Sequence, residues 1–161
     1  SDDFWMPEKL EIQIGIMIKN NYPITFTQYS VFNEDLSNYK YTIKVPDCID
    51  YYGYLKNTII GMSTAIINKK IVGKFSFYNI RSRQDAYLWI TLLKRGHLAY
   101  GIHENLTKYR LRNLSISANK LKAAKMNWFI YFQLENLGFL KASYYFLCYA
   151  YNATIKRLIN K

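Results

Sequence analysis

The chain has 161 residues, half of them hydrophobic, and a net charge of +11 at neutral pH. This composition excludes a disordered tail, and the length favours one domain with a core of its own. Cys48 and Cys148 stand far apart without a CxxC partner, so neither a disulfide framework nor a zinc site is indicated, and a reducing compartment is expected. No stretch approaches the ~20 apolar residues of a spanning helix, so no transmembrane segment is predicted.

The first predicted element is a helix that begins near Pro7, because a proline followed by a glutamate is typical of a first helical turn. Leu10, Ile14 and Met17 would share the apolar face of this helix. The apolar residues of 10–18 also alternate, as they do in a strand, but the start signal and the length favour the helix.

Three short strands and one short helix are predicted next. The β-branched and aromatic residues of 24–31 indicate a buried strand that stops at a turn over 33–35. Strands are also expected over 41–45 and 63–67, with a short helix between them that begins near Ile49.

Helices dominate the second half of the chain. Residues 84–95 have amphipathic spacing, cations in the last turn and a glycine beyond the end, so they predict a helix. A strand is expected over 97–102, and an extended segment follows from Leu106. Ser117 is a plausible cap for a further helix, which would be separated from a last one by a break at Gly138.

The positive charge is confined to the second half of the chain. Residues 81–161 hold fourteen lysines and arginines against three acids, whereas residues 1–80 hold eight of each. Such a field favours phosphate groups on a nucleotide, a nucleic acid or an anionic membrane surface, and composition alone leaves these open. The aromatic residues form no RNA-binding motif and the basic residues are scattered through helices, so we expect no nucleic acid partner.

Two adjacent carboxylates, Asp2 and Asp3, form the first candidate site. They can coordinate a hard divalent cation, which normally keeps one or two protein carboxylates and fills its shell with substrate phosphates and water. One of them can instead cap the helix near Pro7, which is the commoner use of aspartate at such a place. The residues alone favour capping.

The second candidate site pairs Asp85 with Trp89 on the helix predicted over 84–95. They are four residues apart, so both side chains project from the same side of the helix. An indole offers a platform for a sugar ring, and a carboxylate can accept a proton from a sugar hydroxyl. Judged in isolation, however, the segment favours a carboxylate that stabilises the helix dipole beside a tryptophan of the core.

A basic stretch without acids follows, at Tyr109, Arg110 and Arg112. An arginine fork fits phosphate oxygens well. Solvated strand ends are an equally good interpretation of these residues.

The order of these motifs resembles the second half of a bacterial family-two glycosyltransferase of the GT-A fold. The motifs are SDDFWMPEKL, ITFTQYSVFNED, IRSRQDAYLWITLLKRGHLAYGIHENLTKYRLR and SISANKLKAAK, and they cover essentially the whole chain. The resemblance implies an α/β fold, in which residues 1–113 form part of a mixed sheet flanked by helices and residues 114–161 form a C-terminal helical extension.

The resemblance also assigns a donor side to the site. Asp2 matches the last carboxylate of the DxD motif, which holds Mn or Mg against the diphosphate of a nucleotide-sugar, and Asp3 would be its auxiliary. Tyr109 and Arg110 match a region that closes near the diphosphate. Metal and arginine would together offset the charge that grows on the leaving nucleotide.

On the acceptor side, Asp85 matches the catalytic base, which deprotonates the acceptor hydroxyl for an inverting attack on the anomeric carbon. Trp89 would line the acceptor site. Gln84 occupies a place where the family commonly has Glu, which would alter acceptor contacts and leave Asp85 in position. The amino-terminal carboxylates and Asp85 are expected to converge on a shared cleft.

The implied function is transfer of a sugar from a nucleotide-diphosphate sugar to a glycan or lipid-linked acceptor, in surface polysaccharide or lipopolysaccharide synthesis. The first Asp of DxD and the nucleotide-binding half of the family are missing from this sequence, so we expect the isolated chain to be an inactive fragment, truncated product or split enzyme. A separate N-terminal half chain, or self-association, would then complete it. The alternative function is a non-catalytic basic binding module or a partner subunit of a split transferase.

The expected location is the cytoplasm, with peripheral contact at the inner face of the cell membrane. The C-terminal helices combine lysines with many aromatic residues, a mixture suited to an anionic membrane surface, where lipid-linked acceptors are found. Aromatic packing on the catalytic domain, with the lysines solvated, is the alternative.

Overall fold

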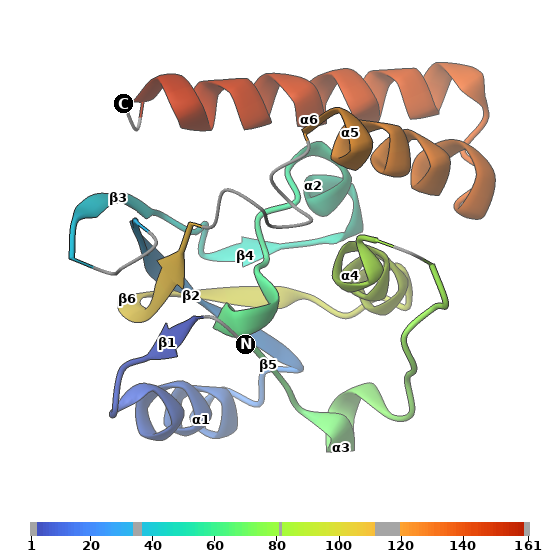
Figure 1. Cartoon of the computed structure of the whole chain (residues 1–161). Coiled ribbons are helices and arrows are strands. Elements are labelled where there is room, and N and C mark those ends of the chain that lie inside the picture. Colours follow the sequence, from blue (N-terminus) through green and yellow to red (C-terminus); the bar gives the residue numbers. More distant parts are fainter. Residues whose placement is uncertain (1–2, 34–36, 81, 112–119, 160–161) are drawn as a thin grey trace.

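A mixed six-stranded sheet with helices on both of its faces forms the fold (Figure 1). The computed structural model describes residues 3–33, 37–80, 82–111 and 120–159. The strands are β1 (Phe4–Trp5), β2 (Ile24–Phe32), β3 (Tyr39–Ile43), β4 (Cys48–Ile49), β5 (Ala65–Ile67) and β6 (Ala99–Arg110). The helices are α1 (Lys9–Lys19), α2 (Tyr51–Lys56), the 3₁₀ helix η1 (Met62–Thr64), α3 (Lys69–Val72), α4 (Gln84–Lys94), α5 (Lys120–Phe129), the π-helix η3 (Ile130–Leu134) and α6 (Phe139–Ile159).

Two long parallel strands, β2 and β6, form the centre of the sheet. Their pairing runs from Ile24 opposite Ala99 to Phe32 opposite Arg110, so their carboxyl ends lie side by side at one edge. β1 and β4 pair antiparallel with β6, and β3 and β5 pair antiparallel with β2. The amino-terminal segment therefore reaches the same edge as the ends of β2 and β6.

The core lies between the sheet and the helices α2, α4 and α6. It includes Phe26 of β2, Trp89 and Leu92 of α4 and Tyr131 of η3, each at most 1% exposed. The hydroxyl of Tyr131 donates to the carbonyl of Leu55 in α2 at 2.7 Å. This buried bond fixes the C-terminal helices to the rest of the chain, because an unmade bond at that depth would cost about 1–3 kcal/mol.

The predicted fold class is confirmed: the chain is an α/β structure with a mixed sheet, flanking helices and C-terminal helices. The proposed division between residues 113 and 114 and the cap at Ser117 lie outside the described residues. The predicted break at Gly138 is present, and this residue has a φ of 73°, which glycine adopts without steric cost. Among the described helices, none is both long and apolar enough to cross a bilayer.

The first predicted helix is present as α1, but its predicted apolar face is wrong. Leu10 and Ile14 are 46% and 39% exposed, while Lys9 and Gln13 are fully buried beside Met17. The face that packs on the sheet is therefore partly polar, because its lysine and glutamine find hydrogen-bond partners there. The separate strand over 97–102 and the extended segment from 106 are also one continuous strand, β6.

Candidate functional site

The amino-terminal carboxylate of Asp3 lies against the carboxyl end of β6. Trp5 pairs with Thr107 across the antiparallel β1–β6 ladder, and the chain before it runs towards Arg110. There the backbone N–H of Arg110 donates a hydrogen bond to Oδ1 of Asp3 at 3.3 Å. The structure thus brings together one residue of the predicted metal site and one of the predicted diphosphate site.

Two tyrosines complete this end of the sheet. The ring centroids of Tyr29 on β2 and Tyr109 on β6 are 5.9 Å apart. Burial raises the pKa of the Tyr29 hydroxyl, and the nearby Tyr109, Tyr41 and Asp3 add to the rise. The Tyr29 hydroxyl therefore stays protonated at neutral pH and can act as a neutral hydrogen-bonding group beside Asp3.

The segment that carries Asp3 is anchored by Trp5. Its indole Nε1 donates to the carbonyl of Ser63 at 2.7 Å, and the Lys9 ammonium lies 4.5 Å from its ring centroid. Lys9 also donates to Oε1 of Gln13 at 2.5 Å, and Gln13 donates to the carbonyl of Thr64 at 3.0 Å. Burial lowers the pKa of the Lys9 ammonium to about 8.

This polar anchor was not predicted. The signal available in the sequence was the four-residue spacing of Lys9 and Gln13, which puts both side chains on one face of the helix. The prediction placed Leu10, Ile14 and Met17 on the packed face instead, since lysine and glutamine are rarely buried without a partner.

The capping interpretation of the amino-terminal acids is wrong for Asp3. The residue that flanks the amino end of α1 is Glu8, and Asp3 instead accepts the hydrogen bond from Arg110. Asp2 lies outside the described residues. Within the described part of the chain, no group of three or more His, Cys, Asp or Glu side chains gathers at one place, so Asp3 is the one described carboxylate of the predicted cation site.

Asp85 lies in the first turn of α4, as predicted, and is partly exposed. Tyr54, a residue of α2 that is 1% exposed, lies within electrostatic range of Asp85. Burial raises the pKa of Tyr54 well above its ordinary value, the Asp85 carboxylate adds to this rise, and Arg83 opposes it. Asp85 and Arg83 therefore both act electrostatically on the buried Tyr54 hydroxyl.

Arg83, two residues before Asp85, is a candidate site residue that the sequence analysis missed. Its backbone is in the left-handed region, with a φ of 60°, just before α4 begins. One guanidinium nitrogen, Nη2, donates to the Thr58 hydroxyl at 3.1 Å, and the guanidinium carbon lies 5.5 Å from the ring centroid of Tyr149. Its Nε is buried and has no hydrogen-bond partner among the described residues. Strained residues of this kind are enriched at functional sites.

The other two predicted acceptor residues occupy different environments. Gln84 is exposed, and its side-chain amide donates to the carbonyl of Ile80 at 2.8 Å. Trp89 is 1% exposed and belongs to the core, with an indole Nε1 that has no partner in the described part of the chain. Their acceptor roles stay predictions.

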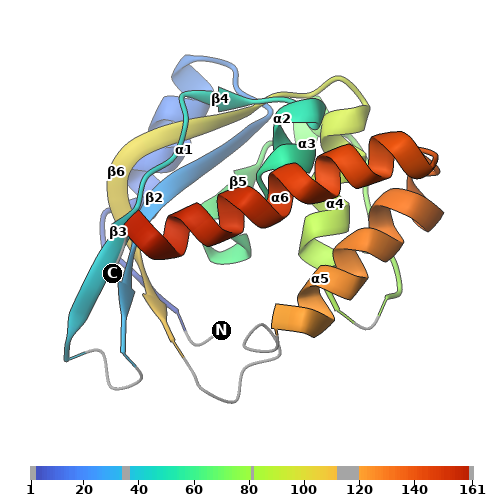
Figure 2. The same cartoon turned by 90° about the horizontal axis from the view of Figure 1, so that it is seen from above.

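The two candidate sites lie on the same side of the molecule. In Figure 2, β1 and the amino end of α4 lie towards the same, lower side of the view. The carboxyl end of β6 points towards the same side. Arg110 is the last residue of β6, and its Nε is buried without a partner among the described residues. A cleft with room for a sugar between the two sites stays a prediction.

Three curated bacterial proteins show what the chain is similar to. The putative teichuronic acid biosynthesis glycosyltransferase TuaG of Bacillus subtilis is 46% identical over 158 residues, which are 98% of this chain and 63% of that protein. The Escherichia coli UDP-Glc:alpha-D-GlcNAc-diphosphoundecaprenol beta-1,3-glucosyltransferase WfgD is 36% identical over 129 residues, 80% of this chain and 50% of that protein. An uncharacterized glycosyltransferase of Haemophilus influenzae is 30% identical over 156 residues, 97% of this chain and 62% of that protein.

The chain thus spans between 50% and 63% of the length of these relatives. No protein-family model matches it. The comparisons confirm the predicted resemblance to a part of a glycosyltransferase, since proteins named as such align with nearly the whole chain. They leave the DxD motif and the role of each site residue as predictions.

Proposed function

We propose that this chain is the part of a bacterial glycosyltransferase that carries the acceptor base and the final carboxylates of the donor site. The whole protein would transfer a sugar, with inversion, from a nucleotide-diphosphate sugar to a glycan or lipid-linked acceptor in surface polysaccharide synthesis. The observation that carries this proposal is the hydrogen bond from the backbone N–H of Arg110 to Asp3, because it places the Asp3 carboxylate at the carboxyl end of β6, which faces the same way as the start of α4.

In this proposal Asp85 accepts the proton of the acceptor hydroxyl while that oxygen attacks the anomeric carbon. Its place in the first turn of α4 and its partial exposure support the role, because a base must reach its substrate. The buried hydroxyl of Tyr54 and the guanidinium of Arg83 would provide a fixed electrostatic environment for Asp85 during proton transfer.

On the donor side, Tyr109 and Arg110 would contact the diphosphate. The Nε of Arg110 supports this role, because it is buried without a hydrogen-bond partner among the described residues and phosphate oxygens could supply the acceptor. The oxygen ligands of Asp2 and Asp3 fit Mn or Mg, and such a cation would neutralise charge on the diphosphate.

The acceptor would be reached at a membrane surface. The name of WfgD specifies a sugar carried on diphosphoundecaprenol, a lipid-linked acceptor, for that protein. In this chain, α6 has an apolar stripe at four-, three- and four-residue intervals, formed by Leu140, Tyr144, Leu147 and Tyr151, which are 52% to 83% exposed. The stripe and the excess of cations in residues 81–161 support peripheral contact with an anionic bilayer.

Replacing Asp85 in the whole protein tests the proposal. Asp85→Asn removes the base at nearly constant shape, so the rate of sugar transfer should fall roughly 10²–10⁴-fold while nucleotide binding is retained. Glu104→Gln is the matched control, because Glu104 is an exposed acid on β6, and its rate should equal that of the parent. Unchanged transfer by the Asp85→Asn protein would remove the residue from this role.

A further inference from the structure

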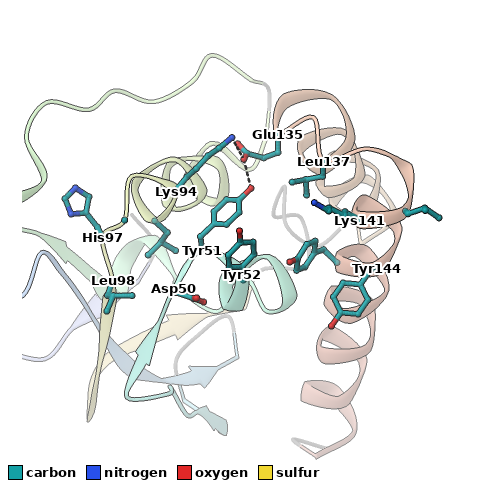
Figure 3. Close-up of a pocket in the computed structure, with 14 residues that line it drawn as sticks. Asp50, Tyr51, Tyr52, Lys94, His97, Leu98, Glu135, Leu137, Lys141 and Tyr144 are labelled. Carbon is teal, nitrogen blue, oxygen red and sulfur yellow. Dashed lines mark hydrogen bonds and ion pairs between the residues drawn. The ribbon is translucent and has the colours of Figure 1, made fainter.

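A cavity of about 760 Å³ opens between α2, the carboxyl end of α4 and the first turns of α6 (Figure 3). Leu93 and Lys94, from the last turn of α4, line it, whereas Asp85 lies in the first turn of that helix. The helix has 11 residues, so its two ends are roughly 16 Å apart. The cavity is therefore a different place from the proposed base, and the volume lies in the range of small-molecule sites.

One wall of the cavity is a continuous row of four tyrosine rings. The ring centroids of Tyr51 and Tyr52 are 5.1 Å apart, those of Tyr52 and Tyr145 are 6.4 Å apart, and those of Tyr145 and Tyr144 are 5.2 Å apart. Tyr52 is 59% and Tyr144 52% exposed. The row thus offers aromatic faces to a ligand, although aromatic side chains of this size would otherwise gain from being buried.

A polar network also lines the cavity, and it shares Tyr51 with the tyrosine row. Oε2 of Glu135 accepts hydrogen bonds from the Tyr51 hydroxyl at 2.7 Å and from the Lys94 ammonium at 2.8 Å, as the dashed lines in Figure 3 mark. The Glu135 side chain is 3% exposed, so this network is held in place by burial. Asp50 and Lys141 add one charge of each sign to the lining.

We propose that this cavity is a second saccharide-binding site, separate from the place of sugar transfer. A pyranose ring has C–H faces that stack on aromatic rings, and its edge carries hydroxyls that both donate and accept hydrogen bonds. The tyrosine row matches the faces, while Asp50, Lys94 and Lys141 match the hydroxyls. Lining charges of both signs fit a hydroxyl-rich ligand better than a simple anion or a wholly apolar molecule.

Saturation-transfer NMR on the whole protein tests the site without any donor or turnover, so it is independent of the proposed transferase function. The probes are chitobiose, cellobiose and glucuronic acid. We expect saturation to pass from tyrosine rings to the C–H protons of at least one probe. Tyr52→Ala and Tyr144→Ala should each weaken its binding about two- to tenfold, because an aromatic contact contributes roughly 0.5–1.5 kcal/mol.

Three variants separate this site from others. Tyr144→Phe keeps the ring and should keep binding. Tyr151→Ala removes another exposed tyrosine of α6, outside the cavity, and should leave binding unchanged. Asp85→Asn should also leave it unchanged. The proposal is overturned if no probe receives saturation from the protein. It is also overturned if Tyr52→Ala and Tyr144→Ala leave binding intact, or if Asp85→Asn alone abolishes it. Far-UV circular dichroism checks that each variant is folded.

Discussion

The carboxylate of Asp3 accepts a hydrogen bond from the backbone amide of Arg110 at 3.3 Å, although 107 positions separate the two residues. The contact exists because the two residues of β1 pair antiparallel with Lys108 and Thr107 near the end of β6. A carboxylate that is oriented by a backbone amide is held at lower entropic cost than a mobile one. This gives the proposed donor site one fixed ligand before any substrate arrives.

Replacing Asp3 by asparagine should weaken cation binding while it preserves this contact. The asparagine side-chain oxygen can still accept from Arg110, but it carries no charge for the cation, so we expect roughly 10–100-fold weaker affinity, as for residues that support a metal site. Calorimetry of the whole protein with Mn²⁺ in the presence of UDP or GDP measures it. Asp47→Asn, at an exposed acid bonded to His103, is the control and should bind as the parent does.

Local patterns predicted the elements that carry the site. The sequences of the strand β2 and the helix α4 each have a clear local pattern, so both elements were predicted within one residue of their observed ends. The strands β1 and β4 have two residues each and exist only because they pair with β6. A two-residue strand has no periodicity of its own, and the contact between Asp3 and Arg110 depends on one of them.

The buried polar side of α1 escaped prediction for a different reason. Apolar residues were assigned to the core, but Lys9 and Gln13 lie there because Trp5 and the carbonyl of Thr64 satisfy them. Such partners come from distant parts of the chain and cannot be read from one helix. Arg83 was missed likewise, because its left-handed backbone is a property of the fold.

The Arg83→Ala protein should be less stable than the Arg83→Gly protein. Both variants lose the hydrogen bond to Thr58 and the contact with Tyr149, so these losses cancel in the comparison. The φ of 60° costs a residue with a Cβ about 1–2 kcal/mol, which glycine avoids. Urea unfolding should therefore give the glycine protein the higher free energy of unfolding, by about 1 kcal/mol.

The neighbouring Gln84 supplies the control for this comparison. It is exposed and lies in the first turn of α4, where glycine is up to about 1 kcal/mol worse than alanine. The order of the two variants should therefore invert between positions 83 and 84. Equal stability of Arg83→Ala and Arg83→Gly would show that the left-handed backbone stores no strain.

Titration of Lys9 should make stability rise with pH above neutrality. Its pKa is about 8 in the folded protein against an ordinary value of 10.5, so between these values the unfolded chain binds more protons than the folded one. The free energy of unfolding then increases with pH, by at most about 1.4 kcal/mol per unit. Below pH 8 both states are protonated and this contribution is flat.

Urea unfolding between pH 7 and 10 measures this effect as a difference between proteins. Lys9→Met has no group to titrate, so its stability relative to the parent should fall steadily above pH 8. The raised pKa values of the buried tyrosines are common to both proteins and cancel. Lys19→Met, at an exposed lysine of the same helix, should follow the parent at every pH. A Lys9→Met curve parallel to the parent would contradict the burial of a titrating ammonium.

The apolar stripe on α6 should govern membrane binding. Leu140 and Leu147 are 83% and 67% exposed, and immersion of each in a bilayer would contribute up to roughly 1.5–3 kcal/mol. The double variant Leu140→Ser, Leu147→Ser should lower co-sedimentation of the whole protein with phosphatidylglycerol–phosphatidylethanolamine vesicles at least about tenfold. Ile18→Ser removes a 70% exposed side chain from α1, across the sheet from α6 in Figure 1, and should change nothing. Equal losses in both proteins would mean that general surface hydrophobicity, rather than α6, drives the binding.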